Sequence, residues 1–348
     1  MTGGVQSPGS EFQSSPSDTR DSQLSTLNPP PVRMAVVGVG HLGRHHARVA
    51  SALPGVELVG IHDKNAERAA EVAREFGLRI LPGLEAVAEQ AQASVVATPT
   101  SSHAEIASFL LERGLDVMIE KPITASLREA DDLLALARAG GRIVQVGHVE
   151  RYNPAVEAAL AMVTAPLFIE VHRLGIFTRR SLDVDVVLDL MIHDLQIVQA
   201  LAGGRAVEIR AAGLPVLTPL LDIANARVAF EGGCVANLTA SRVSAKKVRK
   251  LRIFAPELYV SVDMQARTVK AFRLSRKNGE PEIVQEDVSV PNEEPLAREL
   301  ADFARAVRTR REPLVSGESG RAALALAENV LEAIARHRLA TEREGVRA

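Results

Sequence analysis

The feature that most constrains the fold of this chain is a glycine-rich segment, Gly38-Val39-Gly40-His41-Leu42-Gly43. It follows an apolar run at residues 33–37, typical of a buried strand, and it precedes residues 44–53, which have the pattern of a helix. In that position the first glycine permits a tight turn, the second lets a pyrophosphate approach the backbone, and the third lets helix and strand pack closely. The segment predicts a dinucleotide-binding turn, and the alternative is a glycine-rich turn that binds nothing.

An acidic residue stands at the end of the next predicted strand, residues 57–61. Asp63 lies about 20 residues after Gly43, the spacing at which a carboxylate binds the ribose hydroxyls of a dinucleotide. Because a carboxylate repels the 2′-phosphate of NADP, Asp63 favours NAD as the cofactor and makes NADP the weaker candidate. Lys64 and Arg68 are close in sequence and reduce this preference.

The chain changes its pattern twice. Residues 1–31 are rich in Ser, Pro, Gly and Gln, so we expect an N-terminal segment that is disordered. From residue 32 to about 150, apolar strands alternate with helices, which predicts an α/β Rossmann domain with a parallel sheet. Residues 151–348 contain neighbouring strand-like runs without helices between them, which predicts an α+β domain with an open, mostly antiparallel sheet. We expect this second domain to bind substrate and to form oligomers.

Composition excludes several classes of partner. The 41 basic and 43 acidic residues leave no basic excess for nucleic acid, and aromatic residues are only 3%. No apolar run approaches the roughly 20 residues of a membrane span, and the first residues lack the apolar core of a signal peptide. Cys234 is the single cysteine, so an intrachain disulfide is impossible, which fits a reducing cytoplasm. We expect Cys234 to be a strand residue without chemistry.

The first candidate for catalysis is Glu120-Lys121-Pro122, at the end of the predicted strand 116–119. Ligands of open α/β sheets bind outside the carboxyl ends of the strands, where a lysine can hydrogen-bond a reacting oxygen. The alternative is a solvated ion pair at the end of a strand.

The second candidate is the helix that contains Asp189, His193 and Asp194. Residues four apart share a helix face, so Asp189 and His193 are expected to project together. Histidine is suited to proton transfer near neutral pH, and an adjacent carboxylate can orient it. The alternatives are an ion pair on the helix surface or a buried histidine with satisfied hydrogen bonds.

Other histidines are weaker candidates. His41, His45 and His46 lie in or just after the glycine turn and lack Cys or carboxylate partners at zinc-site spacing, so no metal site is expected. His103 follows Thr98 and Pro99 after a predicted strand. It could line the cofactor site or simply begin the next helix.

Taken in order, these motifs resemble those of the glucose–fructose oxidoreductase and inositol dehydrogenase family (Gfo/Idh/MocA) over about residues 32–340. The resemblance rests on residues 38–47, 97–103, 120–122, 147–154, 189–194 and 313–321. It implies an NAD-dependent oxidoreductase whose C-terminal sheet often forms the oligomer interface, so a homodimer or homotetramer is expected.

The resemblance also implies roles for single residues. Lys121 would bind and polarise the reacting hydroxyl, His193 would be the general acid/base, and Asp189 would position the substrate or the histidine. Glu120 would lie beside the nicotinamide ribose. The expected cofactor-binding set is Gly38, Gly40, His41, Leu42, Gly43, Asp63, Thr98, Pro99, His103, Glu120 and Lys121. The expected substrate-binding set is Arg151, Tyr152, Asn153, Asp189 and His193.

A narrower resemblance concerns residues 147–156 and 180–194. They are similar to the branch of the family that oxidises the 3-hydroxyl of UDP-N-acetylglucosamine, in the pathway that makes a 3-amino sugar for lipid A. The alternatives are a dehydrogenase of a free sugar, cyclitol or other small carbonyl compound, and a non-catalytic nucleotide-binding regulator.

Overall fold

Two β-sheets organise the computed structural model, which describes residues 1, 3, 30–178, 184–277 and 280–343. From Pro31 onwards the chain forms one unit. The disorder expected for residues 1–31 falls almost entirely outside the described residues and stays a prediction, and so does the domain division at residue 150.

The first sheet has five strands in the order β2-β1-β3-β4-β5, and all neighbours are parallel. This confirms the predicted parallel sheet. The order changes direction between β1 and β3, so the carboxyl ends of these two strands border a crevice. The strands are β1 (Val32–Val37), β2 (Val56–His62), β3 (Ala93–Val96), β4 (Asp116–Glu120) and β5 (Val144–Gly147).

Helices connect these strands and begin and end at capping residues. Asn65 accepts a hydrogen bond from the Arg68 amide at the start of α2, and Ser126 forms a capping box with Glu129 at the start of α5. Gly77 and Gly141 end these two helices in left-handed conformation, which glycine adopts without strain. The helical elements are α1 (His41–Ala52), α2 (Ala66–Phe76), α3 (Leu84–Gln90), η1 (Thr100–Ser102), α4 (His103–Glu112) and α5 (Leu127–Gly140). The short α3 was not expected from the sequence.

The second sheet has eight strands in the order β13-β12-β11-β10-β6-β9-β8-β7. Within the described part of this second sheet, only the β6–β9 pair is parallel, which confirms a mostly antiparallel sheet. The strands are β6 (Phe168–Leu174), β7 (Ala206–Leu214), β8 (Ile223–Phe230), β9 (Val235–Ser241), β10 (Val248–Ala255), β11 (Leu258–Asp263), β12 (Thr268–Lys277) and β13 (Glu280–Asp287). The sequence did not indicate β13.

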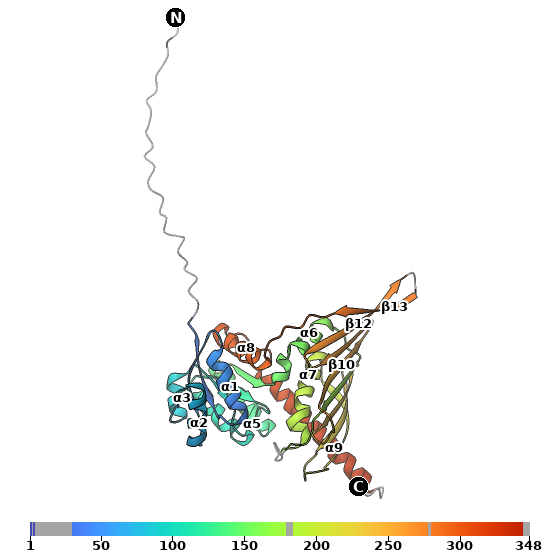
Figure 1. Ribbon diagram of the computed structural model, residues 1–348, viewed down its shortest axis with the longest axis horizontal. Helices are drawn as coiled ribbons and strands as arrows, with labels where there is room; N and C mark the ends of the chain where they lie inside the picture. Colours follow the sequence, from blue (N-terminus) through green and yellow to red (C-terminus); the bar gives the residue numbers. More distant parts are fainter. Residues whose placement is uncertain (2, 4–29, 179–183, 278–279, 344–348) are drawn as a thin grey trace. The chain divides into compact units, whose positions relative to one another are not determined.

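Helices cover one face of this second sheet (Figure 1). Alternate residues of β6 are buried, as in a strand with one face against a core. Ile169 and Val171 share that core with Leu195 of one helix and Val330 of another. The elements on this side are α6 (Pro154–Met162), η3 (Val187–Met191), α7 (Ile192–Ala202) and α9 (Gly317–Arg343). The short η2 (Val149–Tyr152) precedes α6, and its Tyr152 is buried in the core of the first sheet.

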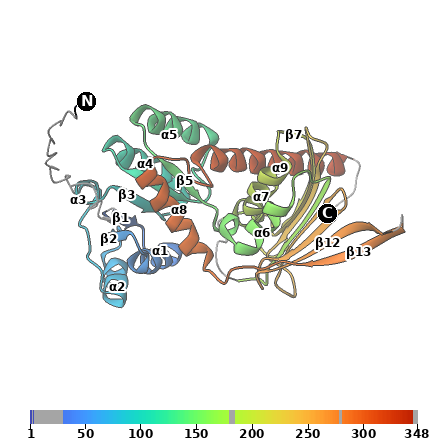
Figure 2. The same cartoon turned by 90° about the horizontal axis from the view of Figure 1, so that it is seen from above.

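The last two helices return to the first sheet (Figure 2). Leu300 and Phe303 of α8 (Pro295–Thr309) are buried with Val36 of β1. Leu324 of α9 is buried in the core of the first sheet, whereas Val330, further along, is buried in the core of the second. The C-terminal residues therefore contribute to the hydrophobic cores of both sheets and hold the two sheets in one unit.

Candidate active site

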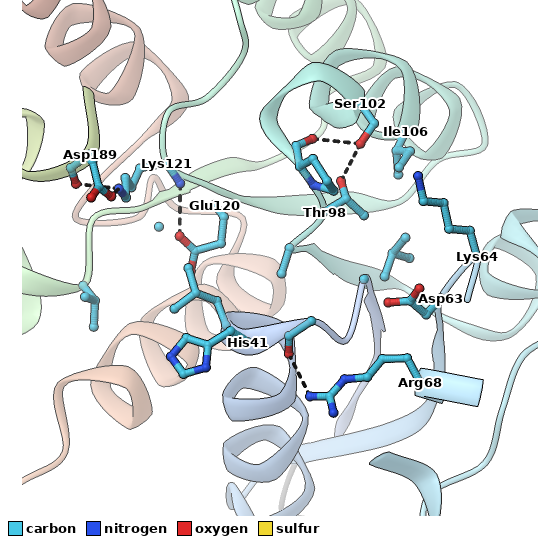
Figure 3. Close-up of a pocket in the computed structure, with 18 of the residues that line it drawn as sticks. His41, Asp63, Lys64, Arg68, Thr98, Ser102, Ile106, Glu120, Lys121 and Asp189 are labelled. Atoms are coloured by element: carbon cyan, nitrogen blue, oxygen red, sulfur yellow. Dashed lines mark hydrogen bonds and ion pairs between the residues drawn. The ribbon is translucent and has the colours of Figure 1, made fainter. Parts of the chain in front are cut away.

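A cavity of about 1320 Å³ lies at the carboxyl ends of the first sheet. This volume exceeds the roughly 300–1,000 Å³ of a pocket for one small ligand. Asp63 and Lys64 lie at one end of it, and Lys121 and Asp189 lie at the other (Figure 3). The second sheet contributes Arg173, so both sheets form the wall of one site.

The glycine turn has three different constraints. Gly38 has φ +84°, a conformation that favours glycine. A Cβ on Gly43 would lie 1.8 Å from the carbonyl oxygen of Gly38, so helix α1 can approach β1 only if residue 43 is glycine. A Cβ on Gly40, in contrast, would meet no atom of the chain within 4 Å. Gly40 lines the cavity, so its missing side chain leaves room for a ligand rather than for the protein.

Asp63 follows β2 and joins it to the glycine turn. Its Oδ2 accepts a hydrogen bond of 2.7 Å from the Val39 amide, and its Oδ1 accepts one from the Asn65 amide. The Arg68 guanidinium donates to the Val39 carbonyl and pairs with Glu71. Arg68 is therefore held against the turn and partly neutralised, whereas the Asp63 carboxylate is an acidic group that lines this end of the cavity.

The segment after β3 forms the next part of the wall. Thr98 and Pro99 line the cavity, and so do His41 and Leu42 of the turn. The Ser102 hydroxyl lies 2.9 Å from the Thr98 hydroxyl oxygen and 2.8 Å from the Pro99 carbonyl oxygen, and these contacts hold the segment in place. The position of His103 differs from the one expected of a cofactor-binding residue. It is 1% exposed and absent from the cavity wall, and its ring nitrogens lie 3.0 and 2.9 Å from the carbonyl oxygens of Pro122 and Thr98.

These residues fit a dinucleotide. The amides of the turn precede the N-terminus of α1, where free N–H groups and the helix dipole favour a pyrophosphate. The space beside Gly40 permits close approach, and Asp63 lies where ribose hydroxyls are expected.

Lys121 lies at the end of β4 and reaches the second half of the chain. Its Nζ donates to the backbone carbonyl of Asp189 at 2.6 Å and to the Asp189 carboxylate at 3.2 Å. The Lys121 side chain is 13% exposed, through the cavity that it lines. Since an ammonium has three protons, two contacts to Asp189 leave one proton for a ligand.

Glu120, the residue before Lys121, is fixed through both of its carboxylate oxygens. Its Oε1 lies 2.7 Å from Nε2 of the buried His46, and its Oε2 accepts a hydrogen bond from the Lys121 amide. Burial opposes ionisation of Glu120, but the hydrogen bond from His46 and the charge of Lys121 outweigh it and lower its pKa. Glu120 is therefore an anion at the middle of the cavity wall.

The helix with Asp189 and His193 is less regular than expected. Residues Val187–Met191 form a π-helical turn, a feature often found at functional sites, and α7 starts at Ile192. Asp189 and His193 both line the cavity, but no hydrogen bond joins them in the described part of the chain. Asp189 was expected to position either the substrate or His193. The contact with His193 is not seen, because Asp189 is bonded to Lys121.

His193 is a partly buried, neutral imidazole that lines the cavity. Burial and the positive charges of Lys121 and Arg173 hold its pKa well below the usual value. Its Nδ1 is buried and has no hydrogen-bond partner among the described residues. A neutral histidine beside a lysine is suited to accept a proton from a ligand hydroxyl.

Asp194 belongs to a second polar network. Its carboxylate accepts two hydrogen bonds, of 2.8 and 2.7 Å, from the buried Arg173 of β6. Arg173 also donates to Glu150, and Glu150 accepts from Arg249 of β10 at 2.7 Å. Asp194 therefore does not orient His193, and sequence reasoning missed Glu150, Arg173 and Arg249, which all line the cavity. Only Glu150 had a sequence signal, since it lies soon after the end of a predicted strand.

Three expected substrate residues lie outside the cavity wall: Arg151, Tyr152 and Asn153. Tyr152 is 1% exposed and donates to Asp302 of α8. Asn153 caps helix α6 and donates to the Met264 carbonyl. The contacts of Tyr152 and Asn153 join elements of the fold, so the structure differs here from the expectation. Residues 180–183 of the narrower resemblance lie outside the described residues.

Two further observations concern the whole described chain. In its described part, no group of three His, Cys, Asp or Glu side chains is placed to hold a metal ion. Among the helices described, none combines the length and the apolar character needed to cross a membrane.

Comparison with known proteins identifies the family. The model of an oxidoreductase family with an NAD-binding Rossmann fold matches residues 32–148, and that of the GFO/IDH/MocA C-terminal domain matches residues 156–257. A UDP-N-acetylglucosamine 3-dehydrogenase of Acidithiobacillus ferrooxidans is 39% identical over 87% of this chain and 97% of its own length. A scyllo-inositol 2-dehydrogenase (NAD(+)) of Bacillus subtilis is 28% identical over 82% of this chain and 89% of its own length.

Comparison with solved structures shows the same similarity. The structure of the Acidithiobacillus ferrooxidans enzyme matches with a TM-score of 0.82 at 38% identity, over 87% of this chain and 97% of that one. An oxidoreductase of Agrobacterium radiobacter in complex with NAD+, L-tartaric acid and magnesium matches with a TM-score of 0.78 at 17% identity, over 87% and 96%, and shares the fold. This chain therefore belongs to the Gfo/Idh/MocA family of oxidoreductases, whose N-terminal part is an NAD-binding Rossmann fold.

Proposed function

We propose that this protein is an NAD-dependent dehydrogenase that oxidises the 3-hydroxyl of UDP-N-acetylglucosamine. The observation that carries the proposal is the convergence of Lys121, Asp189 and His193 on one cavity with a dinucleotide turn. The substrate rests on the 39% identity to an enzyme of that name, which extends over most of both chains.

The proposed cofactor is NAD rather than NADP. A carboxylate at Asp63 accepts hydrogen bonds from ribose hydroxyls and repels a 2′-phosphate. The nearby Arg68 is engaged by the Val39 carbonyl and by Glu71, so it is poorly placed to bind a phosphate. Lys64 is the remaining cation at this end of the cavity, and Asp63 lies beside it.

The protein residues divide the reaction between them. The bound nicotinamide would supply the hydride acceptor. The third proton of Lys121 would hydrogen-bond the substrate oxygen and favour its alkoxide character. His193, kept neutral by desolvation and by the positive charge of Lys121, would take the hydroxyl proton. Asp189 would keep Lys121 in place through both of its contacts.

A nucleotide sugar also requires a place for its diphosphate. Arg249 lies on β10 at the substrate end of the cavity, and its side chain is 48% exposed. It uses one nitrogen for Glu150, which leaves other N–H groups of its guanidinium to bind phosphate oxygens. This supports a UDP-sugar over an uncharged cyclitol.

The test is NADH formation with purified protein and a panel of alcohols. We expect turnover with UDP-N-acetylglucosamine and little with free N-acetylglucosamine or inositols. Turnover with scyllo-inositol alone would favour the second candidate, a cyclitol dehydrogenase, to which the chain is 28% identical. NAD binding without reduction by any alcohol would favour a nucleotide-binding regulator instead.

The 3-oxo product would suit transfer of an amino group, as a 3-amino sugar of lipid A requires.

The open face of the second sheet is the proposed oligomer interface. Phe168, Phe254, Tyr259 and Phe272 form a row of ring contacts across four neighbouring strands, on the face opposite the buried core. Pairing of two copies through this row would shelter the rings, and we propose a homodimer or homotetramer. Replacing Phe254 by Glu should reduce the sedimentation coefficient.

We also propose a cytoplasmic location, where NAD and nucleotide sugars are available.

A further inference from the structure

His148 is a second histidine beside the proposed base. It directly follows β5, at the same edge of the first sheet at which Lys121 follows β4. The residues on either side of it, Gly147 and Val149, line the cavity. The side chain of His148 points into the protein and is 1% exposed.

The ring nitrogens of His148 are unusual for a buried group. Neither Nδ1 nor Nε2 has a hydrogen-bond partner among the described residues, and the same is true of Nδ1 of His193. Burying a polar group without a partner destabilises the fold, so a phenylalanine would be preferred if only the shape of the ring mattered. The nitrogens of His148 therefore point to an interaction that forms during the reaction.

The two imidazoles are in direct contact. Their centroids are 5.5 Å apart and their planes meet at 87°, an edge-to-face arrangement. Each ring limits the rotation of the other. Burial and the charge of Lys121 lower the pKa of His148 to about 3, against the opposing effect of Glu120. A neutral His148 keeps one nitrogen lone pair that can accept a hydrogen bond.

We propose that His148 is a positioning residue that accepts a hydrogen bond from Nδ1–H of His193 once His193 has taken the substrate proton. The proposal rests on the proposed role of His193 as the base. The O–H bond of the substrate breaks and an N–H bond forms at Nε2 of His193, while the oxygen keeps the electron pair. This pair becomes the second bond of the new carbonyl as the hydride leaves for the nicotinamide. No proton passes to His148, so its effect is to stabilise the imidazolium.

The proposed role of His148 follows a general requirement of histidines that act as bases. A base that becomes charged in the transition state needs an acceptor for its second N–H. Asp189 and Asp194 are both engaged elsewhere, with Lys121 and with Arg173. His148 is the ring packed against His193, so the geometry assigns this part to an imidazole in place of a carboxylate.

Three variants of the full-length protein test the proposal: His148→Phe, His148→Gln and, as a control on the open face of β6, His172→Phe. His148→Phe keeps a ring and removes both nitrogens, whereas His148→Gln restores an acceptor. We expect His148→Phe to lower kcat by about 10- to 100-fold, the effect of one lost hydrogen bond to a charged group. KM and the Kd of NADH, measured by fluorescence, should stay within about twofold. His148→Gln should recover at least part of kcat, and His172→Phe should behave as wild type.

The pH profile separates this role from a structural one. Without its acceptor, protonated His193 is less stable, so the acid limb of kcat should move to lower pH in His148→Phe and return in His148→Gln. Unchanged kcat and pH profile in His148→Phe would overturn the proposal. Equal losses in both variants, with weaker NADH binding, would also overturn it and would assign His148 to the fold. A parallel His193→Asn variant shows whether the base itself is assigned correctly: if it retains turnover, the proposed role of His193 fails first.

Discussion

Nζ of Lys121 lies 2.6 Å from the backbone carbonyl oxygen of Asp189 and 3.2 Å from the Asp189 carboxylate. Lys121 ends a strand of the first sheet, and Asp189 lies on the π-helical turn η3, packed against the second. This contact fixes the group that would bind the substrate oxygen relative to the dinucleotide turn. Because one partner atom is a backbone oxygen, the position of Lys121 depends on the path of the chain through η3 as well as on the side chain of Asp189.

Lys121→Met keeps most of the volume of the side chain and removes its charge. We expect kcat/KM to fall by at least about 10²-fold, because an electrostatic contact to the reacting oxygen is lost. The Kd of NADH should change little. Lys250→Met, in which the lysine pairs with Asp263 on a strand of the second sheet, is the matched control. Turnover within tenfold of wild type in Lys121→Met would contradict the role of this residue.

The glycine turn can be tested with two similar substitutions. Gly43→Ala places a Cβ 1.8 Å from the Gly38 carbonyl oxygen, so we expect a lower melting temperature together with weaker NADH binding. Gly40→Ala meets no atom of the chain within 4 Å, so its melting temperature without cofactor should equal that of wild type. Its NADH affinity should nevertheless fall, since the new methyl group occupies space beside the pyrophosphate. Wild-type NADH affinity in Gly40→Ala would show that the dinucleotide lies elsewhere.

Asp63→Ser should change the preference between the two cofactors. Loss of charged hydrogen bonds to the ribose should lower kcat/KM with NAD by about 10- to 100-fold. The value with NADP should rise or stay constant, because the repulsion of the 2′-phosphate is removed. Steady-state kinetics with both cofactors measures the ratio. An unchanged ratio would mean that Asp63 acts only through its bond to the Val39 amide.

Arg249→Ala should raise KM for UDP-N-acetylglucosamine by about 10-fold or more with a smaller effect on kcat, because a charge-assisted contact is lost in both the ground state and the transition state. The control is Arg252→Ala on the same strand, where the arginine pairs with Glu170 and is absent from the cavity wall. Calorimetric titration of each variant with UDP alone measures its UDP affinity and gives the same comparison without turnover. Equal UDP affinity in both variants would remove Arg249 from the diphosphate site.

Stability should depend on pH through two histidines whose pKa is lowered in the folded protein. His148 and His193 have pKa values below 6.5 in the folded protein, about 3 for His148, so the unfolded chain binds protons that the folded protein excludes. Stability should therefore fall as pH drops below about 6.5, by roughly 1.4 kcal/mol per pH unit for each histidine. Urea unfolding at pH 7.5 and 5.5 measures this loss, which should be smaller in His148→Phe. The same loss in both proteins would mean that His148 is protonated in the folded state.

Much of the fold follows from local sequence patterns. Two patterns depend only on neighbouring residues and could therefore be recognised in the sequence. They are the three glycines between a strand and a helix, and the alternation of apolar strands with helices. Lys121 was placed correctly at the cavity because the carboxyl end of a parallel strand is a position that sequence defines.

The missed features depend on contacts between distant segments. Tyr152 and Asn153 look polar and available in sequence, but their partners Asp302 and Met264 lie far along the chain. Arg173 and Arg249 belong to paired positions on adjacent strands, and no local pattern shows that pairing. The π-helical turn around Asp189 was also invisible, since it has the composition of an ordinary helix. His148 did have a signal, because it follows a strand end, as Lys121 does.

The central claim is tested most directly by NADH formation at 340 nm with NAD and UDP-N-acetylglucosamine, compared with free N-acetylglucosamine and scyllo-inositol. The account predicts turnover with the UDP-sugar, loss of it in Lys121→Met, and a product that carries a carbonyl at carbon 3 by mass spectrometry and NMR. Turnover with scyllo-inositol and none with any UDP-sugar would contradict it.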